Sequence, residues 1–382
     1  MLLRTPDLDA DDHRVLDNIE AMREQLRLHV RATPRWTGQL RRNLAAAAIR
    51  GSNTIEHITV SMSEARAAVE GQTMSSEVDT KTQAAILGCR DALTYVQQTP
   101  QMPFFGYDEM LLSALHFMIQ KYEMSKWPGR YRAGGIFVTS SDPLRPAYTG
   151  PDPDLVPGLM RELVEWLNHG DLDQPALVRA SMAHVNLVSI HPWRDGNGRM
   201  SRCLHTLVLA RDGVLAPEFS SIEEWLGHEV NTLAYYQALQ SRGEIYQPET
   251  ADCHPWLRFA LTAHHQQAQT VAARVDYTVR LWREMEELAG QRGLPERVVS
   301  ALYAAAVGEL RRTTYQADED LTRDQAIRDV QALVRAGLVR ARGNAATRVY
   351  LIDGVAREAH LAAMDAVRKP MVDPYRDGGS AR

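Results

Sequence analysis

The hydrophobic positions of this 382-residue chain recur with helical spacing over most of its length. In the N-terminal third the spacing predicts helices over residues 14–30, 39–49, 63–70, 77–97 and 107–122. Gly51 follows the second of these and is expected to cap its C-terminal end. Helical spacing resumes over residues 156–168, 174–190, 198–211, 222–242 and 254–288. The pattern therefore predicts a mainly α-helical protein.

Two segments depart from the helical pattern. Residues 129–150 contain the β-prone run Ile136–Thr139, followed by a polar, Pro-rich return. They are predicted to form a β-hairpin flap with little core of its own. Residues 295–355 read as three helices followed by two short strands around a turn at Gly343-Asn344, which is the order of a winged helix-turn-helix domain.

We therefore expect several domains along the chain. The third helix of the C-terminal unit has a good N-cap in Thr322 and a good C-cap in Gly337. The C-terminal sequence VDPYRDGGSAR is expected to be disordered. The predicted boundaries are N-terminal helices over 1–104, a catalytic core over 105–245, a helical linker over 246–294, a winged helix over 295–355 and a tail over 356–382.

Composition narrows the class of protein. The longest apolar runs are too short for a membrane span, and the N-terminus turns acidic at once, so neither a transmembrane helix nor a secretory signal is expected. The three cysteines form no CxxC pair, which suits a reducing compartment. The predicted location is cytoplasmic, without a membrane partner. Basic residues are nearly all Arg, with Lys only at 81, 121, 126 and 369.

The segment SIHPWRDGNGRMSRCLH, residues 189–205, lies between two apolar helices. Gly196 and Gly198 permit a tight turn, and a Gly-Asn-Gly turn that enters a helix directs successive N–H groups to one point. Arg199 and Arg202 lie three residues apart on the first turn of that helix and are expected to face the same anion. The combination predicts a site for more than one phosphate.

Two further side chains supply chemistry to this anion site. Asp195 lies beside the turn and could hold a Mg²⁺ ion that bridges phosphates. His191 lies at the end of the preceding helix, within reach for a general base. An anion cradle, an Arg clamp, a metal carboxylate and a base are the parts of phosphoryl-type transfer.

These residues resemble the motif HPFx(D/E)GNGRxxR of the Fic/Doc family, with Trp193 in place of the usual Phe. The resemblance extends over roughly residues 35–245. YRAGGIFV looks like the family's flap, and AYYQAL, residues 234–239, looks like its adenine-side Tyr pair. AIRGSNTIEHITVS resembles its inhibitory helix. The fold that this implies is a Fic-type helical core with a β-hairpin flap.

The resemblance implies transfer of AMP from ATP to a hydroxyl of a target protein, with ATP and Mg²⁺ as the required small molecules. His191 would take the proton from a Ser, Thr or Tyr, and Asp195 would hold Mg²⁺. Gly196, Asn197 and Gly198 would cradle the phosphates, with Asn197 helping to orient the α-phosphate. Arg199 and Arg202 would bind the β- and γ-phosphates of the leaving group.

The sequence also predicts roles for residues outside this motif. Ser52 and Glu56 resemble the family's inhibitory motif (S/T)xxxE(G/N), with His57 as a departure, and Glu56 would occupy the γ-phosphate position on Arg202. Tyr235 and Tyr236 are candidates for the adenine side, or else core aromatics. The flap run Ile136, Phe137 and Val138 is a candidate for pairing with a target segment, or else an ordinary hairpin.

Two alternative functions remain open at this point. The moved group could be another nucleotide, phosphocholine or phosphate. Alternatively, the chain could be a DNA-binding regulator whose site senses a nucleotide, with Arg323, Gln325 and Arg328 facing DNA. The region 296–350 carries nine Arg against seven acidic residues, a smaller positive charge than a DNA-binding domain normally has. A protein partner or a second copy of the chain is therefore at least as well supported. His264 and His265 are expected at the surface.

Overall fold

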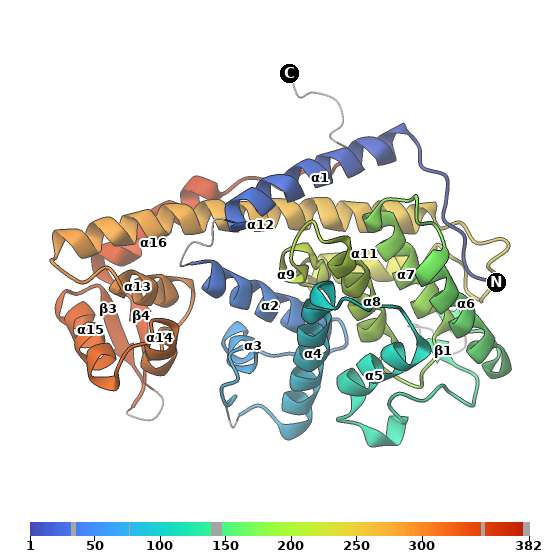
Figure 1. Ribbon diagram of the computed structural model, residues 1–382, viewed down its shortest axis with the longest axis horizontal. Helices are drawn as coiled ribbons and strands as arrows, with labels where there is room; N and C mark the ends of the chain where they lie inside the picture. The colour runs from blue at the N-terminus through green and yellow to red at the C-terminus, as the bar shows by residue number, and fades with distance from the viewer. Residues whose placement is uncertain (32–35, 76, 139–146, 345–347, 377–382) are drawn as a thin grey trace. The chain divides into compact units, whose positions relative to one another are not determined.

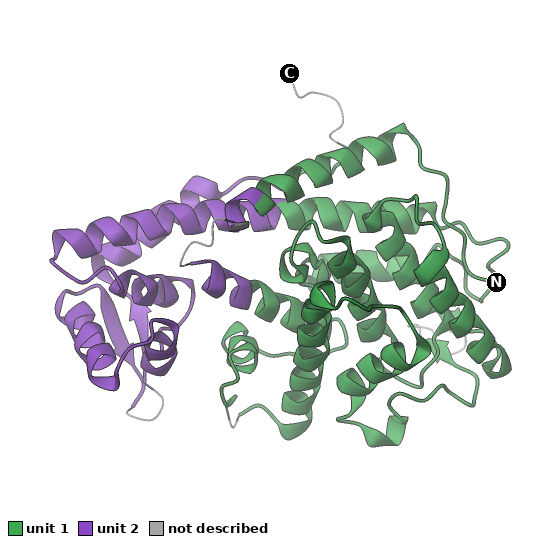
Figure 2. Cartoon of the chain, viewed as in Figure 1, with its two compact units in different colours: residues 1–27, 44–268, 372–382 green, residues 28–43, 269–371 purple. Residues whose placement is uncertain are grey.

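The computed structural model describes residues 1–31, 36–75, 77–138, 147–344 and 348–376. The chain divides into two compact units (Figure 2). The first comprises residues 1–27, 44–268 and 372–382, and the second comprises residues 28–43 and 269–371. Both are built mainly from helices, which confirms the predicted fold class (Figure 1). The boundaries drawn from the sequence remain a prediction.

Helices account for most of the chain up to residue 291. In chain order they are α1 (Ala10–Arg31), α2 (Thr37–Thr54), α3 (Met62–Val69), α4 (Thr80–Gln98), α5 (Glu109–Gln120), α6 (Val156–His169), α7 (Ala176–Ile190), α8 (Asn197–Asp212), α9 (Pro217–Ser220), α10 (Glu223–Leu226), α11 (Glu229–Gln240) and α12 (His254–Gln291). Short 3-10 helices are η1 (Thr99–Gln101), η2 (Met124–Lys126) and η3 (Pro153–Leu155). None of the helices in the described part of the chain is long and apolar enough to cross a membrane.

The centre of the first unit is the pair α7 and α8, which pack against each other. Residues 180–190 of α7 and 199–210 of α8 are all buried. A helix that is apolar around its whole circumference is stable only inside a core. Because the core fixes both helices, it also fixes the two ends of the short segment that joins them, which contains the candidate site.

The predicted end of α2 at Gly51 is wrong, because the helix continues through Gly51 to Thr54. A Cβ atom at Gly51 would lie 2.1 Å from the main-chain oxygen of Glu223, at the start of α10. Gly51 therefore lets the backbone of α10 approach α2, rather than ending the helix. The segment 222–242, predicted as one helix, is broken into α10 and α11 at Gly227 and His228.

The flap forms the predicted hairpin on a small scale. β1 (Phe137–Val138) pairs antiparallel with β2 (Tyr148–Thr149), with Phe137 opposite Thr149. Thr139, the last residue of the predicted strand run, lies outside the described residues. The main-chain N–H of Thr149 also donates to the carbonyl of Glu244 at 2.8 Å, so the hairpin is attached to the chain that follows α11.

The second unit contains α13 (Val298–Val307), α14 (Arg312–Asp318), α15 (Arg323–Arg335), β3 (Val339–Arg342), β4 (Val349–Ile352) and α16 (Gly354–Val367). Three helices followed by an antiparallel pair is the predicted order, although assignment to the winged-helix class stays a prediction. Thr322 caps α15 as expected, in a reciprocal capping box with Gln325. Gly337 follows this helix with a φ of 67°.

The C-terminal part agrees with the sequence in one respect and differs in another. The two strands lie on either side of Gly343-Asn344 as predicted, with Arg342 opposite Val349, and residues 345–347 of the connection are outside the described chain. Residues expected to form a tail include helix α16. Beyond it, Tyr375 is ordered because its hydroxyl donates to the buried carboxylate of Asp12 at 2.9 Å.

Candidate functional site

The segment between α7 and α8 is held in shape by its own side chains. His191 ends α7 with a φ of 51°, and Gly196 precedes α8 with a φ of 78°. The Asn197 amide accepts from the N–H of Trp193 at 3.0 Å and donates to its carbonyl at 2.8 Å. The Asn197 side chain therefore faces into the loop and stabilises its shape.

The N-terminus of α8 provides the expected position for an anion. The first N–H groups of a helix have no partner within the helix, and the helix dipole favours negative charge there. The structure places the Glu56 carboxylate at this end. A Cβ atom on Gly198 would lie 2.4 Å from Oε1 of Glu56, so only a glycine leaves room for an oxygen this close.

His191 has the protonation state that a general base requires. Its Nδ1 lies 3.1 Å from the carbonyl oxygen of Val188, so Nδ1 carries the proton and donates. Nε2 is then left with a free lone pair. Burial lowers the pKa of His191 to about 4, so the imidazole is neutral at pH 7. The Arg132 guanidinium donates to the main-chain oxygen of His191 at 2.8 Å and fixes its position.

The side chain of Arg202 is buried and joins α8 to the end of α2. Its Nε donates to the Ser52 hydroxyl at 3.0 Å, and Nη2 donates to the Ser52 carbonyl and to Oε1 of Glu56, both at 2.8 Å. The structure thus brings together the three residues that the sequence linked across 150 positions. In this conformation the carboxylate of Glu56 is held by Arg202.

Burial and charge act in opposite directions on the ionisation of this pair. Burial raises the pKa of Glu56, but the charge and hydrogen bond of Arg202, together with the charge of Arg199, bring that pKa below its usual value. Burial likewise opposes the charge on Arg202, while Glu56 raises the pKa of the guanidinium. Glu56 is therefore ionised at neutral pH, although its side chain is only 29% exposed. The ion pair is well suited to exclude another anion from Arg202.

Arg199 is buried on the neighbouring face of α8. Its Nη2 donates to Oε1 of Gln120 at 2.6 Å and to the Tyr122 hydroxyl at 2.9 Å. Among the described residues, Nε and Nη1 have no hydrogen-bond partner. Unpaired buried N–H groups are energetically costly, so Nε and Nη1 of Arg199 are suited to donate to an acceptor such as a phosphate oxygen.

Asp195 lies at the edge of the same site with its side chain 41% exposed. Oδ1 accepts from the N–H of Gly196 at 2.7 Å, and Oδ2 lies 4.0 Å from Nζ of Lys126. A half-exposed carboxylate oxygen next to an anion position is the kind of ligand that Mg²⁺ takes in nucleotide sites, so the chemistry of the residue fits the metal that the sequence predicted.

Comparison with known proteins agrees with this geometry. Residues 107–209, which include the whole loop and both Arg residues, match the Fic/DOC family. The chain contains a Fic/DOC domain. It is similar to the protein adenylyltransferase Fic of Nematostella vectensis, with 28% identity over 211 residues, covering 53% of this chain and 46% of that protein. It is also similar to protein adenylyltransferase fic-1 of Caenorhabditis elegans, with 24% identity over 271 residues, covering 69% and 47%.

The chain thus spans less than half the length of these two curated relatives. Solved structures support the fold. A Fic family protein from Desulfovibrio desulfuricans G20 matches with a TM-score of 0.59 and 21% identity, over 92% of this chain and 98% of that one. A Fic domain containing signaling protein from Bacteroides thetaiotaomicron VPI-5482 matches with a TM-score of 0.57 and 19% identity, over 68% and 97%.

The sequence analysis missed a polar strip on α5 that contacts the loop between α7 and α8, residues 191–196, here called the Fic loop. His116 and Gln120 are fully buried and one helical turn apart on a largely apolar helix. Nε2 of His116 lies 2.8 Å from the carbonyl of Asp195, while its Nδ1 accepts from the N–H of Gly129 at 2.8 Å. The ring also stacks on Trp193, with centroids 4.2 Å apart. A His and a Gln one helical turn apart in a mainly apolar segment were the feature of the sequence that could have identified this strip.

The Tyr pair splits between two environments. Tyr235 is buried, its hydroxyl lies 2.9 Å from Nε2 of His184, and its ring packs near Trp256, so it is a core aromatic. Tyr236 is 41% exposed and donates to the carbonyl of Ile55, the residue before Glu56, at 3.1 Å. Only Tyr236 is available to a ligand in this conformation, and its role at the adenine remains a prediction.

The flap residues near the Fic loop differ in exposure. The Phe137 side chain is 64% exposed, while those of Ile136 and Val138 are less accessible. Ile136 accepts from Gly150 and Val138 accepts from Ala147, both toward β2. Because main-chain groups alternate along a strand, those of Phe137 point to the opposite, outer edge. The docking role of the flap stays a prediction.

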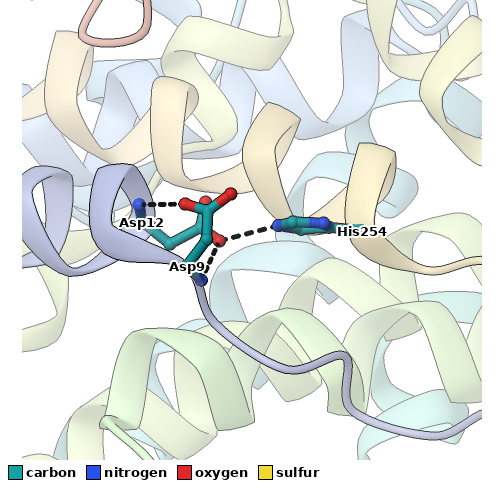
Figure 3. A group of neighbouring side chains, drawn as sticks. All are labelled: Asp9, Asp12 and His254. Carbon is teal, nitrogen blue, oxygen red and sulfur yellow. Dashed lines mark hydrogen bonds and ion pairs between the residues drawn. The ribbon is translucent and has the colours of Figure 1, made fainter.

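Two clusters that contain buried or paired histidines outside the Fic loop were not predicted. His264 is buried, contrary to its expected surface position, with its Nε2 2.8 Å from Nε2 of His205; His265 is buried as well. A second group, Asp9, Asp12 and His254, has ligand atoms close enough for a metal ion (Figure 3). Both oxygens of Asp12 already accept hydrogen bonds, so the group serves to join α1 to the start of α12.

Proposed function

We propose that the chain transfers AMP from ATP to a Ser, Thr or Tyr hydroxyl of a protein and that Glu56 holds this activity off. The observation that carries the proposal is the neutral His191, with a free Nε2, next to a helix N-terminus whose Arg202 already binds a carboxylate. Relatives named protein adenylyltransferase share the domain. The chemistry of the site fits nucleotide phosphates.

In the proposed reaction, Nε2 of His191 accepts the proton of the target hydroxyl. The hydroxyl oxygen forms a bond to the α-phosphorus of ATP, and the bond from that phosphorus to the bridging oxygen of the β-phosphate breaks. AMP becomes esterified to the protein and pyrophosphate leaves. The N–H groups at the start of α8, with Arg199 and Arg202, stabilise the charge that develops on the phosphates.

Asp195 is the residue of the loop that would hold Mg²⁺. When bound, the metal would neutralise phosphate charge, which eases departure of pyrophosphate. The His116 ring supports this position because it donates to the main-chain oxygen of Asp195. Its other nitrogen accepts an N–H, so the ring is neutral there. Burial lowers the pKa of His116 to about 4, which agrees with that state.

The inhibition proposed for Glu56 follows from its position. Its carboxylate occupies Arg202 and lies over Gly198, where the terminal phosphates would have to enter. A bound carboxylate and a bound phosphate compete for the same donors. Because Ser52 and Glu56 both belong to the end of α2 and its following turn, displacement of that segment would release Arg202 for ATP.

Radiolabelled ATP tests the transfer reaction. We expect label from the α-phosphate to appear on protein and label from the γ-phosphate not to appear, when the chain is incubated with cell lysate and Mg²⁺. His191→Ala should abolish labelling while ATP still binds, because the phosphates are held by α8 and the Arg residues. Transfer of γ-label would instead indicate a kinase-type reaction and would overturn the proposal.

Substitution of Glu56 tests the inhibition. Glu56→Gly should raise self-labelling and target labelling strongly, at least about tenfold, because a charged competitor is removed from Arg202. Glu77→Gly, an exposed Glu in the turn before α4, is the matched control and should leave the rate unchanged. Equal rates for wild type and Glu56→Gly at saturating ATP would show that Glu56 does not restrain the enzyme.

A further inference from the structure

A cavity of about 230 Å³ lies beside the Fic loop and is lined by residues that the proposed reaction does not fully use. Its walls come from the start of α4, the turn after α5, the start of α8 and the loop before it, and they include Lys81, Thr82, Tyr122, Asp195 and Arg199. Glu56 also borders it. One water needs only about 10–15 Å³ of such space, so the cavity can hold a much larger group.

Arg199 presents unpaired hydrogen-bond donors at the wall of this cavity. The residue is 3% exposed, yet Nε and Nη1 have no hydrogen-bond partner among the described residues. Gln120 and Tyr122 hold Nη2, so the guanidinium is fixed in place. A fixed, buried cation with two unpaired N–H groups on a cavity wall is suited to a phosphate, which offers several acceptor oxygens.

Lys81 faces the same cavity from the first turn of α4, the N-terminal end of a 19-residue helix. Its ammonium is paired with Glu123 and lies 5.9 Å from the Tyr122 ring centroid. That side chain is 63% exposed, and exposed ion pairs of this kind are weak and readily exchanged. The hydrogen bond to Glu123 raises the pKa of Lys81, so the ammonium stays charged at neutral pH.

We infer that Lys81 binds the terminal phosphate of a nucleoside triphosphate, opposite Arg199, and selects tri- over diphosphates. The inference rests on the proposed nucleotide site and adds a residue to it from outside the Fic motif. On binding, Lys81 exchanges Glu123 for the phosphate. The chain has only four Lys among its 43 Lys and Arg residues, and Lys81 is the one on the wall of this cavity.

Because the chain has only four lysines, the binding of a phosphate by Lys81 can be tested directly, without measuring AMP transfer. Amine acylation followed by mass spectrometry reports each Lys separately. In the Glu56→Gly variant we expect Mg·ATP to slow acylation of Lys81, ADP to slow it less and AMP not at all. Lys121, which pairs with Asp91 away from the cavity, and Lys369 are the internal controls. Unchanged acylation of Lys81 at an ATP concentration that saturates the protein would overturn the inference.

Calorimetric binding supplies the second measurement. Lys81→Met in the same background should weaken ATP binding about tenfold while changing the Kd for ADP much less, as expected for loss of one charge-assisted contact. Lys81→Arg should restore most of the difference, and Lys121→Met should behave like the parent. If Lys81→Met leaves the ratio of the Kd values for ATP and ADP unchanged, the role of Lys81 is contradicted, while the proposed function is not. Absence of ATP binding in the parent would overturn the proposed function as well.

Discussion

The imidazole of His191 makes a specific prediction about pH. Burial lowers the pKa of His191 to about 4, and only the neutral form can accept a proton. Therefore kcat/KM of the Glu56→Gly variant should stay constant as the pH falls from 8 to about 5. It should decline only when the pH approaches the pKa of His191 in the free enzyme. A pH–rate profile checks this. A decline centred near the usual histidine value of about 6.5 would show that the ring is solvated.

Residues of the site were predictable where the chemistry is contiguous in the sequence. His191, Asp195, Arg199 and Arg202 lie within a dozen positions, and the loop between two buried helices brings them to one place. His116 was not predictable as a partner of the loop because 79 residues separate it from Asp195. The inward turn of the Asn197 amide was also hidden, since an Asn in such a turn can equally well point to a ligand.

At the scale of elements, Gly51 links the packing of α2 to the proposed inhibition. Gly51→Ala would place a Cβ atom 2.1 Å from a main-chain oxygen of α10, so the end of α2, with Ser52, must shift. We expect faster AMP transfer together with a loss of about 1–3 kcal/mol in the free energy of unfolding, as is usual for overpacking.

The control for this variant lies on the same helix. Within the described residues, the nearest atom to a Cβ atom on Gly38 would be 3.7 Å away, on the flexible Arg42 side chain. Gly38→Ala should therefore leave the transfer rate unchanged and stabilise the helix slightly, since Ala is the better helix former. Labelling rates and urea unfolding measure both effects. A Gly51→Ala enzyme that remains as slow as wild type would mean that the α2 end tolerates the methyl group without moving.

Helical segments were predictable from their spacing, whereas their ends were set by contacts between segments. α2 passes through Gly51 because α10 requires the close approach, and α10 separates from α11 at Gly227, whose own Cβ would lie 2.5 Å from the Cα of Gly51. Periodicity contains no information about such a neighbour. The ordered position of Tyr375 likewise depends on Asp12, which lies 363 residues away.

At the scale of the whole molecule, the site residues from Ser52 to Arg202 all belong to the first unit. Deletion of residues 295–382 should therefore leave the ATP affinity of the Glu56→Gly variant within about threefold. The deletion also removes Tyr375 from Asp12, so we expect a lower Tm, part of which Tyr375→Phe should reproduce. Loss of ATP binding by a truncated protein that is still folded would show that nucleotide binding depends on the removed residues.

Four buried histidines should make the first unit sensitive to acid. Burial lowers the pKa of His116 to about 4 and of His205 to about 3, and places those of His184 and His264 well below the usual value. Below pH 6.5 the unfolded chain binds more protons than the folded one, so stability falls with decreasing pH, by up to ~1.4 kcal/mol per unit for each residue. Urea unfolding at pH 7.5, 6 and 5 measures this slope. A stability that is level over that range would contradict the buried neutral state.

The facing imidazoles of His205 and His264 have a consequence for calorimetry. Two nitrogens 2.8 Å apart in the core cannot readily both carry a proton, so these rings take up protons only when the core opens. Near pH 5 those protons come from the buffer. The heat of unfolding measured there must therefore include the ionisation heat of the buffer. Scans in two buffers with different ionisation heats should differ by that heat multiplied by the number of protons absorbed.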